Sequence, residues 1–349
     1  MAVRCGPSLF NANLTRGPRL LRRSKRLRGV LFMLPEIYFD IIGCPRCAGA
    51  FDQTTAEEIV CRACSARYPV VEDIPVLIVD SDDAVSRIAQ DFYATQWKRD
   101  ADNRLQAKVV HEDLSDRGQR YIQTNEARFF SSTQNLGRKR IFLDAGCGAQ
   151  PRVTFGADYD YHVCLDFSLD GLYEARQQIG ERCVPIIGSL LKMPLRAEIA
   201  DAALASHCIY HIDADKQPEA LCELQRVLVP GAPLLVFYAN PDSLENRVIG
   251  ALRGLKRRTP RPSAAAQLYF NPLSIAVMQQ HFQRYFGEGL VHVAPLRFVS
   301  VTISRPVFRL PLLGSLHYAL WTWFERSFPK SAGASLCTYV SYTGRKQNS

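Results

Sequence analysis

The sequence contains no apolar run long enough to cross a membrane as a helix. Candidates such as GVLFML fall far short of the roughly 20 residues needed, and His317 and Thr322 interrupt the aromatic stretch at 316–324. Internal repeats and long low-complexity segments are also absent. With 47% hydrophobic and 22% charged residues in 349 positions, the composition indicates a globular chain of one large domain with an appendage, or of two domains.

Acidic residues are missing from the first 32 positions, where eight lysines and arginines occur. The chain has a formal net charge of +9, and subtracting these eight leaves +1 for the remainder. A general polyanion-binding surface is therefore not expected on the body of the protein. Residues 1–34 have three interpretations: an arginine-rich transit peptide, a basic arm for membrane or RNA, or a disordered extension, which we favour. Translation from Met33 is a further hypothesis.

The chain has eleven cysteines, an odd number, and no recognisable signal peptide. Seven of them are scattered, mostly within apolar runs: Cys5, Cys147, Cys164, Cys183, Cys208, Cys222 and Cys337. Scattered buried thiols are more typical of a reducing compartment than of a disulfide framework. We therefore predict a cytoplasmic protein, with association to a membrane surface as a second expectation.

The other four cysteines form two CxxC pairs. Cys44 and Cys47 are followed, after thirteen residues, by Cys61 and Cys64. Two such pairs can bring four thiolates to one tetrahedral point, as structural zinc requires, and a segment this short depends on the metal for folding. Iron is the main competitor for four thiolates, and a redox dithiol pair is the weaker functional alternative.

The segment IIGCPRC…VCRACSARYPVVEDIPVLI resembles the zinc-ribbon family found in the small activator subunit of tRNA and ribosome methyltransferases. That family also occurs fused to the front of bacterial methyltransferases. The most specific part is YPVVEDIPVLI, which predicts a strand, a turn at Glu72–Asp73 and a second strand. We expect a zinc-ribbon domain over residues 35–80, which either braces the neighbouring domain or recognises substrate directly.

Residues 81–135 are polar with helical spacing, and we expect a helical lid or linker there. One predicted helix places Val85, Ile88, Phe92 and Trp97 on one side, and YIQTNEARFFSS predicts another. After Lys139, short apolar runs alternate with helical segments. The expected strands are 141–145, 161–166, 183–187, 201–206 and 233–239, and the expected helices are 169–180 and 214–228. This alternation predicts an α/β fold, with helices on both faces of a parallel sheet.

The stretch RIFLDAGCGAQ ends an apolar run in Asp144 and continues into a glycine turn. In such a sheet, ligands bind beyond the carboxyl ends of the strands, where glycines let the backbone approach closely. Asp166 follows Asp144 by 22 positions and can accept hydrogen bonds from two ribose hydroxyls. A nicotinamide dinucleotide site is disfavoured, because Gly146 and Gly148 are not followed by the third glycine of GxGxxG.

FLDAGCGAQ resembles the first motif of class I S-adenosylmethionine-dependent methyltransferases, and later blocks follow in that family's order. These blocks are Asp166, IIGSLLKMPL, IADAALASHCIYHI, ELQRVLVPGAPLLVFYANP and, more loosely, LCTYVSYTGRK. The closest general label is methyltransferase type 11. The resemblance implies a Rossmann-like, mostly parallel seven-stranded sheet whose last strand is antiparallel, and S-adenosyl-L-methionine as cofactor. We expect this domain over residues 136–349, with additions at 241–288 and 297–335.

The resemblance also implies contacts for each part of the cofactor. Asp144, Gly146 and Gly148 hold the methionine end, Asp166 the ribose, and Ser189 with Leu190 the adenine. Ala145, Phe167 and His207 are further cofactor-binding candidates, with His207 near the methyl group. Three positions depart from the family's pattern. Gln150 replaces the third glycine, Ala232 replaces the second glycine of a Pro-Gly-Gly turn, and Ser189 replaces the acid that usually contacts adenine.

An oxygen acceptor needs a base for its proton, and an in-line displacement needs donor and acceptor held in place. His207 is the preferred base, with His211 and Tyr210 as the other catalytic candidates. Tyr210 could line the acceptor pocket, and packing of His211 against the following helix is the alternative to catalysis.

Acceptor selection is expected in the two additions. RGLKRRTPRP is a basic loop that could contact phosphates of a substrate or membrane, or be simply solvated. In LPLLGSLHYALWTWFERSFP, Leu313, Leu316, Leu320 and Trp323 recur at helical spacing. This face could pack on the sheet, form the wall of an apolar acceptor pocket, or lie in a membrane interface.

We therefore predict methyl transfer to an oxygen of a small molecule, a sugar or a lipid-linked acceptor, with peripheral membrane contact through the basic loop and the aromatic helix. One alternative is an RNA base methyltransferase that uses the zinc ribbon for RNA recognition. The near-neutral body and the missing Asn-Pro-Pro-aromatic motif make nucleic acid the less expected partner. A second alternative is a non-catalytic partner protein that retains the fold.

Overall fold

The computed structural model describes residues 33–79, 116–134, 137–255, 270–287, 291–327 and 333–347. Three predictions lie outside these ranges: the extension at 1–32, the helix around 85–97, and most of the basic loop, at 256–261. Within the first range, helix α1 (Glu36–Ile41) precedes a four-stranded antiparallel sheet in the order β1-β2-β3-β4. Its strands are β1 (Phe51–Thr55), β2 (Glu58–Cys61), β3 (Arg67–Val71) and β4 (Ile74–Pro75).

The predicted turn at Glu72–Asp73 is confirmed. It joins β3 to β4, and both residues have a positive φ, 51° and 64°, as a two-residue type I′ hairpin requires. Side chains of α5 (Leu169–Ile179) hold this turn in place. The Tyr173 hydroxyl donates to the Glu72 carboxylate, and the Arg176 guanidinium donates to the Glu72 carbonyl at 3.2 Å.

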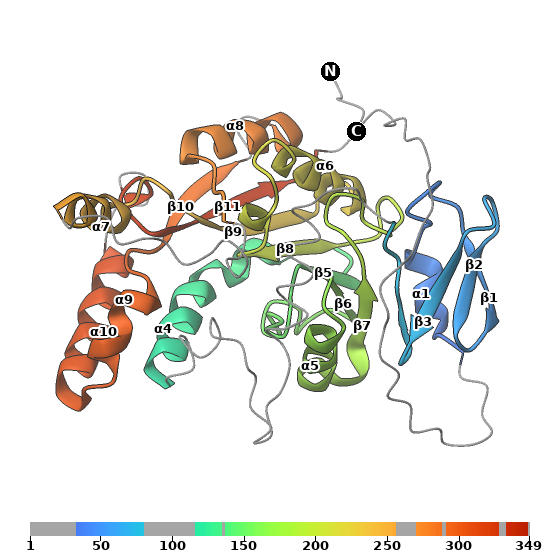
Figure 1. The fold of residues 1–349 in the computed structure, drawn as a ribbon, viewed down its shortest axis with the longest axis horizontal. Coiled ribbons are helices and arrows are strands. Elements are labelled where there is room, and N and C mark those ends of the chain that lie inside the picture. Colours follow the sequence, from blue (N-terminus) through green and yellow to red (C-terminus); the bar gives the residue numbers. More distant parts are fainter. Residues whose placement is uncertain are drawn as a thin grey trace.

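A seven-stranded sheet forms the centre of the rest of the chain (Figure 1), in the order β10-β11-β9-β8-β5-β6-β7. The strands are β5 (Ile141–Ala145), β6 (Tyr161–Asp166), β7 (Cys183–Ile187), β8 (Ala202–Ser206), β9 (Pro233–Ala239), β10 (His292–Arg297) and β11 (Tyr339–Arg345). The direction of β11 is opposite to that of the other six strands. The predicted fold class is therefore confirmed, and each of the five predicted strands lies within one residue of its expected bounds.

Helices cover both faces of this sheet. In Figure 1, α6 (Gln217–Val227) and α8 (Ile275–Phe286) lie on one side, and α4 (Asp116–Glu126) and α5 lie on the other. Short 3-10 helices occur at Ala127–Thr133 (η1), Gly180–Arg182 (η2) and Ile209–His211 (η3). The added segments contribute α8 and also α7 (Leu244–Leu255), α9 (Val301–Phe308) and α10 (Pro311–Ser327). No helix in the described ranges has both the length and the hydropathy of a membrane span.

The amino-terminal module covers the β7 edge of the large sheet. Val76 pairs with Ile187 in a parallel bridge, and the Leu77 amide donates to the Ile187 carbonyl at 2.8 Å. On the other side of the module, the Arg196 amide donates to the Ile41 carbonyl at 2.8 Å. An uncovered edge strand would expose unpaired backbone groups, so these contacts brace the sheet as well as the module.

The predicted apolar helix near residue 320 is present as α10, but the expectation that its leucine face packs on the sheet is wrong. Leu313, Leu316, Leu320 and Trp323 are 58%, 67%, 56% and 64% exposed. The opposite side of α10 faces the protein instead, with Gly314, Thr322 and Glu325 buried.

Asp201, directly before β8, joins that strand to β5. Its carboxylate is fully buried and accepts hydrogen bonds from the backbone amides of Arg140 and Ile141, both at 2.9 Å. The Arg138 guanidinium donates to its other oxygen at 2.7 Å. One side chain therefore supplies the acceptors for the two amides that lead into β5.

Replacing Asp201 with alanine should lower the free energy of unfolding by about 3 kcal/mol, since it leaves two buried amides and a guanidinium without their acceptor. Urea denaturation of wild type and variant measures the change. Asp242→Ala, at an exposed loop position, is the matched control and should leave the midpoint unchanged. An Asp201→Ala midpoint equal to that of wild type would contradict this account of the β5–β8 junction.

Candidate functional site: a four-cysteine metal centre and the carboxyl edge of the sheet

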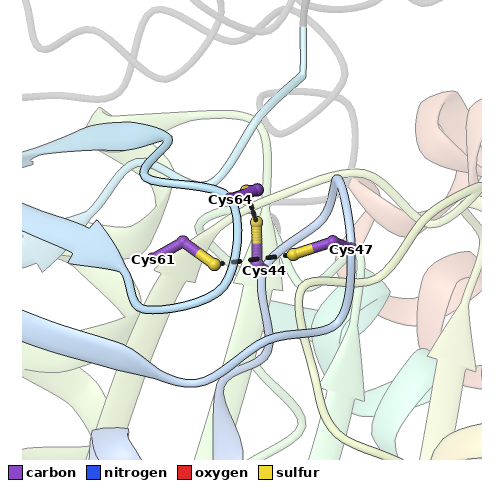
Figure 2. A group of neighbouring side chains, drawn as sticks. All are labelled: Cys44, Cys47, Cys61 and Cys64. Carbon is purple, nitrogen blue, oxygen red and sulfur yellow. Dashed lines mark hydrogen bonds between the residues drawn. The ribbon is translucent and has the colours of Figure 1, made fainter.

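The four paired cysteines converge at one point, two from the loop after α1 and two from the end of β2 and the turn that follows it (Figure 2). Their Sγ atoms all lie within 4.8 Å of one another, with 3.5 Å between Cys47 and Cys61 and 3.7 Å between Cys44 and Cys64. A tetrahedral zinc ion with Zn–S bonds of about 2.3 Å would separate its sulfurs by about 3.8 Å. The spacing and the all-thiol donor set therefore fit a structural zinc ion, as predicted.

The two CxxC pairs adopt the same local conformation. The Ala48 amide donates to the Cys44 carbonyl at 2.7 Å, and the Ser65 amide donates to the Cys61 carbonyl at 3.0 Å. Ala48 and Ser65 have φ values of 59° and 57°, a left-handed conformation that turns the chain sharply after each pair. The repeated turn directs all four thiols inward.

Gly49 and Tyr68 complete the surroundings of the metal centre, and neither was among the predicted site residues. A Cβ on Gly49 would lie 3.0 Å from the Cys61 sulfur and 3.3 Å from the Cys47 sulfur, so a larger residue would crowd the ligands. The Tyr68 hydroxyl lies 3.5 Å from the Cys44 sulfur and covers it on the buried side. No spacing rule marks these two residues, because their role depends on the folded turn.

At the carboxyl edge of the large sheet, the glycine turn after β5 lies directly against the end of β8. Gly146 has a φ of 71°, and a Cβ there would lie 2.6 Å from the Cβ of Cys208 and 3.6 Å from Leu190. The Cys208 thiol donates to the Ala145 carbonyl at 3.2 Å. The structure therefore brings the predicted residues Ala145, Gly146 and Leu190 together, and position 146 accommodates only glycine.

Asp144, at the end of β5, is fully buried and organises the chain after the turn. Its Oδ2 accepts a hydrogen bond from the Arg152 amide at 2.7 Å and lies 3.3 Å from His162 Nε2. Its Oδ1 is buried and has no hydrogen-bond partner among the described residues. This oxygen remains available as an acceptor for a cationic group of a ligand.

Asp166, at the end of β6, accepts hydrogen bonds from the Gly148 amide at 2.9 Å and the Ser168 amide at 2.8 Å, one on each oxygen. A carboxylate has about four acceptor positions, so each oxygen retains one for a further donor such as a ribose hydroxyl. Burial raises the pKa of Asp166 to about 6, against the opposing effect of these amide hydrogen bonds. Phe167 follows in the same strand-to-helix turn and is partly buried.

The predicted adenine segment follows β7, next to the glycine turn. The Ser189 hydroxyl accepts from the Leu191 amide at 3.2 Å, and Leu190 is buried. Gly188 was not predicted as a site residue, but a Cβ there would lie 2.7 Å from Pro194 and 2.8 Å from Leu165. This segment leads directly into Pro194–Arg196, which bonds to the zinc module, so the metal centre supports the candidate cofactor site.

Beyond β8, His207 forms a second cluster with two residues that the sequence analysis missed. The Arg297 guanidinium donates to His207 Nε2 at 3.1 Å and lies 4.4 Å from the centre of the Tyr339 ring. The His207 ring meets Tyr339 edge-on at 4.8 Å, and its Nδ1 has no partner among the described residues. Burial, together with Arg297 and Arg152, holds the pKa of His207 well below its usual range, so the ring is neutral at physiological pH.

Tyr210 and His211 lie on η3, on the far side of His207. The Tyr210 ring is 6.2 Å from that of His207, and it contacts His211 at 4.5 Å and Phe270 at 5.1 Å. Tyr210 therefore lies close enough to His207 for both rings to contact the same acceptor. His211 packs against the Tyr210 ring. Arg297 and Tyr339 gave no sequence signal, because they reach this edge through β10 and β11, far along the chain.

Comparison with known proteins identifies the class. Residues 143–236 match the family model described as a methyltransferase domain, a range that begins in β5 and ends in β9 and so contains the glycine turn, Asp166 and His207. With the predicted seven-stranded, mostly parallel sheet present, the chain is an S-adenosylmethionine-dependent methyltransferase.

The amino-terminal region has its own relatives. It is 40% identical over 42 residues to a UPF0434 protein of Dechloromonas aromatica, a match covering 12% of this chain and 72% of that protein. A UPF0434 protein of Shewanella sp. (strain W3-18-1) is 42% identical over 40 residues, 11% of this chain and 68% of the relative. Through this region, the chain belongs to the UPF0434 family.

Solved structures are similar to this chain at low sequence identity and low TM-score. The N-methyltransferase NodS of Bradyrhizobium japonicum, in complex with S-adenosyl-l-homocysteine, is 12% identical with a TM-score of 0.44, covering 69% of this chain and 97% of NodS. A Haloferax volcanii complex of the Trm112 methyltransferase activator with a protein described as a methyltransferase is 11% identical with a TM-score of 0.45, covering 69% and 96%. Because both the sequence identities and the TM-scores are low, we base no functional statement on these two structures.

Substituting Cys61 with serine should abolish zinc binding and lower the melting temperature. It should also weaken the binding of S-adenosylhomocysteine, because the segment after β7 loses its support. Atomic emission spectroscopy should find about one zinc per wild-type chain and almost none in the variant.

Cys183→Ser, at the start of β7, is the matched thiol control and should retain the metal. If Cys61→Ser cannot be purified, removal of zinc from wild type with a chelator gives the same test. Full zinc content in Cys61→Ser, or unchanged ligand affinity in the metal-free protein, would contradict the support that we assign to the module.

Proposed function

We propose that the protein transfers the methyl group of S-adenosylmethionine to a hydroxyl oxygen of a small-molecule, sugar or lipid-linked acceptor that also carries an anionic group. The observation that carries this proposal is the His207–Arg297 hydrogen bond next to the Gly146 turn. A neutral imidazole and a buried guanidinium then meet at the carboxyl edge, beside the expected position of the methyl group.

Four features support the proposed cofactor contacts. The left-handed Gly146 leaves room that a side chain would fill, Asp144 has a spare buried oxygen, and both oxygens of Asp166 retain an acceptor position. The partly buried Ser189 lies where an adenine contact is proposed, in place of the family's usual acid. When bound, S-adenosylmethionine supplies an electrophilic methyl group on a positively charged sulfur.

Arg297 is 5% exposed, and its guanidinium can bind a phosphate or carboxylate through two parallel hydrogen bonds. In the described state it instead donates to His207 Nε2, which fixes the proton of the neutral ring on Nδ1. We propose that an anionic group on the acceptor draws Arg297 away from His207. This exchange frees the Nε2 lone pair and partly neutralises the positive charge that lowers the pKa of His207.

His207 then acts as the base that the sequence analysis predicted. On transfer of the methyl group that bound S-adenosylmethionine would supply, Nε2 of His207 would take the proton of the acceptor hydroxyl, and neutral S-adenosylhomocysteine would be the product. Tyr210 and Tyr339 flank the imidazole and exclude water from the lone pair. His211 holds Tyr210 in place and does not itself touch the acceptor.

Labelling with methyl-tritiated S-adenosylmethionine tests the proposal. Purified protein is incubated with a lipid extract, a pool of small metabolites and total RNA in separate reactions. We expect label in the lipid or metabolite reaction, in a product that binds an anion-exchange resin. Label confined to RNA would overturn the proposal and favour RNA base methylation, and no label in any fraction would favour a non-catalytic role.

Two variants separate the acceptor and cofactor roles in this assay. Arg297→Gln should lose at least tenfold in labelling while its affinity for S-adenosylhomocysteine stays that of wild type, because Arg297 is proposed to bind the acceptor and not the cofactor. Asp166→Ala should lose both the methyl labelling and the affinity for S-adenosylhomocysteine. An Arg297→Gln variant with wild-type labelling would contradict the anionic-acceptor assignment.

The raised pKa of Asp166 predicts that cofactor affinity falls in acid. Ribose hydroxyls donate to the carboxylate, so binding favours the charged form, and with a free-protein pKa of about 6 affinity is lost as the pH falls below that value. Calorimetric titration with S-adenosylhomocysteine should give roughly tenfold weaker binding at about pH 5 than at pH 7.5. Asp166→Asn should bind more weakly and show no such slope, and a flat wild-type profile would argue against the ribose contact.

A further inference from the structure

The described part of the chain has a concentration of exposed apolar side chains on α7, α9, α10 and the turn between α9 and α10. Ten of its thirteen exposed large apolar residues lie there: Leu244, Val248, Leu252, Ile303, Leu310, Leu312, Leu313, Leu316, Leu320 and Trp323. In Figure 1 these helices lie at one end of the molecule, opposite the zinc module. Exposed leucines concentrated on helices at one end of the molecule point to an interaction site rather than an ordinary surface.

Helix α10 is held in this orientation by polar contacts on its inner side. Glu325, which is 3% exposed, accepts from the Phe298 amide at 2.9 Å and from the Tyr121 hydroxyl. The Tyr318 hydroxyl lies 3.1 Å from that of Thr124. Turning the leucines inward would break these bonds and bury apolar surface against polar groups, so the leucine face stays outside.

The turn between α9 and α10 is fixed in the same way. The Arg117 guanidinium donates to the carbonyls of Phe308, Leu310 and Pro311 at 2.7–3.1 Å. A Cβ on Gly314 would lie 2.7 Å from this guanidinium and 2.8 Å from two carbonyls of α9. The pair α9–α10 therefore presents its apolar residues as a rigid unit.

The charges on these helices are arranged for an anionic partner. Arg247, Arg309 and Arg326 are exposed, whereas the acidic residues of the same helices point inward. Glu245 accepts from the Ser300 amide at 2.7 Å and from Thr338, and Glu325 is bound as described above. An outer surface of leucine, tryptophan and arginine without an outward acid has the composition of a helix that lies in an anionic membrane interface.

We infer that the apolar faces of α7, α9 and α10, with their flanking arginines, dock the protein on an anionic lipid bilayer. Helix α10 has 17 residues and lies parallel to the bilayer plane rather than across it. Its inner side carries Glu325, which also binds the Phe298 amide next to Arg297, so the docked face connects directly to the proposed acceptor cluster. This inference deepens the proposed function with a lipid-linked acceptor, but its test measures binding without catalysis.

The test is flotation of the full-length protein with vesicles of phosphatidylcholine alone or mixed with phosphatidylglycerol. Wild type should float with the mixed vesicles and much less with neutral ones. Leu316→Glu/Leu320→Glu should bind the mixed vesicles at least tenfold more weakly, because two membrane anchors become charged. Val277→Glu, on the exposed side of α8, is the matched control and should bind as wild type.

A second readout reports the depth of Trp323. A Trp97→Phe/Trp321→Phe variant retains Trp323 as its single tryptophan, and its emission should shift to the blue on mixed vesicles. The melting temperature of Leu316→Glu/Leu320→Glu should equal that of wild type, since both leucines are exposed.

Four results would each overturn the inference. These are absence of binding to mixed vesicles, equal binding by the double glutamate variant, a lowered melting temperature of that variant, and a dimer of wild type that the same two substitutions dissociate. The last would assign the face to a second copy of the chain, and equal binding would assign vesicle affinity to another basic region. Loss of vesicle binding together with intact methyl labelling of small metabolites would leave the proposed function standing.

Discussion

The organisation of the candidate cofactor site depends on the hydrogen bonds that Asp166 accepts from Gly148 and Ser168. They tie the glycine turn after β5 to the start of α5, across the carboxyl ends of two neighbouring strands. Because both amides are already bound, the turn needs no ligand to take its shape, and a cofactor meets an organised backbone. The burial of Asp166 strengthens these hydrogen bonds and also raises the pKa of its carboxyl group. The same burial therefore affects both the shape of the turn and the pH at which Asp166 becomes charged.

The zinc module extends this organisation to the edge of the sheet. Four thiolates stabilise a module with too few residues to bury a core of its own, and the module then pairs with Ile187 and Leu195 on either side of Ser189. Its Ile37 and Ile41 belong to the same apolar cluster as Leu221 of α6 and Phe282 of α8. The metal centre and the methyltransferase sheet are therefore parts of one packed structure, which favours bracing over an independent recognition role.

Much of this arrangement is visible in the sequence. The strands are short apolar runs buried on both faces, and the CxxC spacing defines the metal centre without further context. Arg297 and Tyr339 could not be predicted, because β10 and β11 bring them to His207 only in the folded sheet. The period of the leucines showed that α10 has an apolar side, but not which side faces solvent. That choice is made by Tyr121, Arg117 and Thr124 of α4, whose contacts leave no periodic signal.

The most direct test of the central claim is the melting temperature of the zinc-loaded protein with and without S-adenosylmethionine and S-adenosylhomocysteine, for wild type and Asp166→Ala. A ligand that binds only the folded state raises the melting temperature by mass action. We expect a clear rise for wild type with both ligands, and little or none for Asp166→Ala. No rise for wild type at millimolar ligand, or an equal rise in the variant, would contradict a cofactor site built around Asp166 at the carboxyl edge of the sheet.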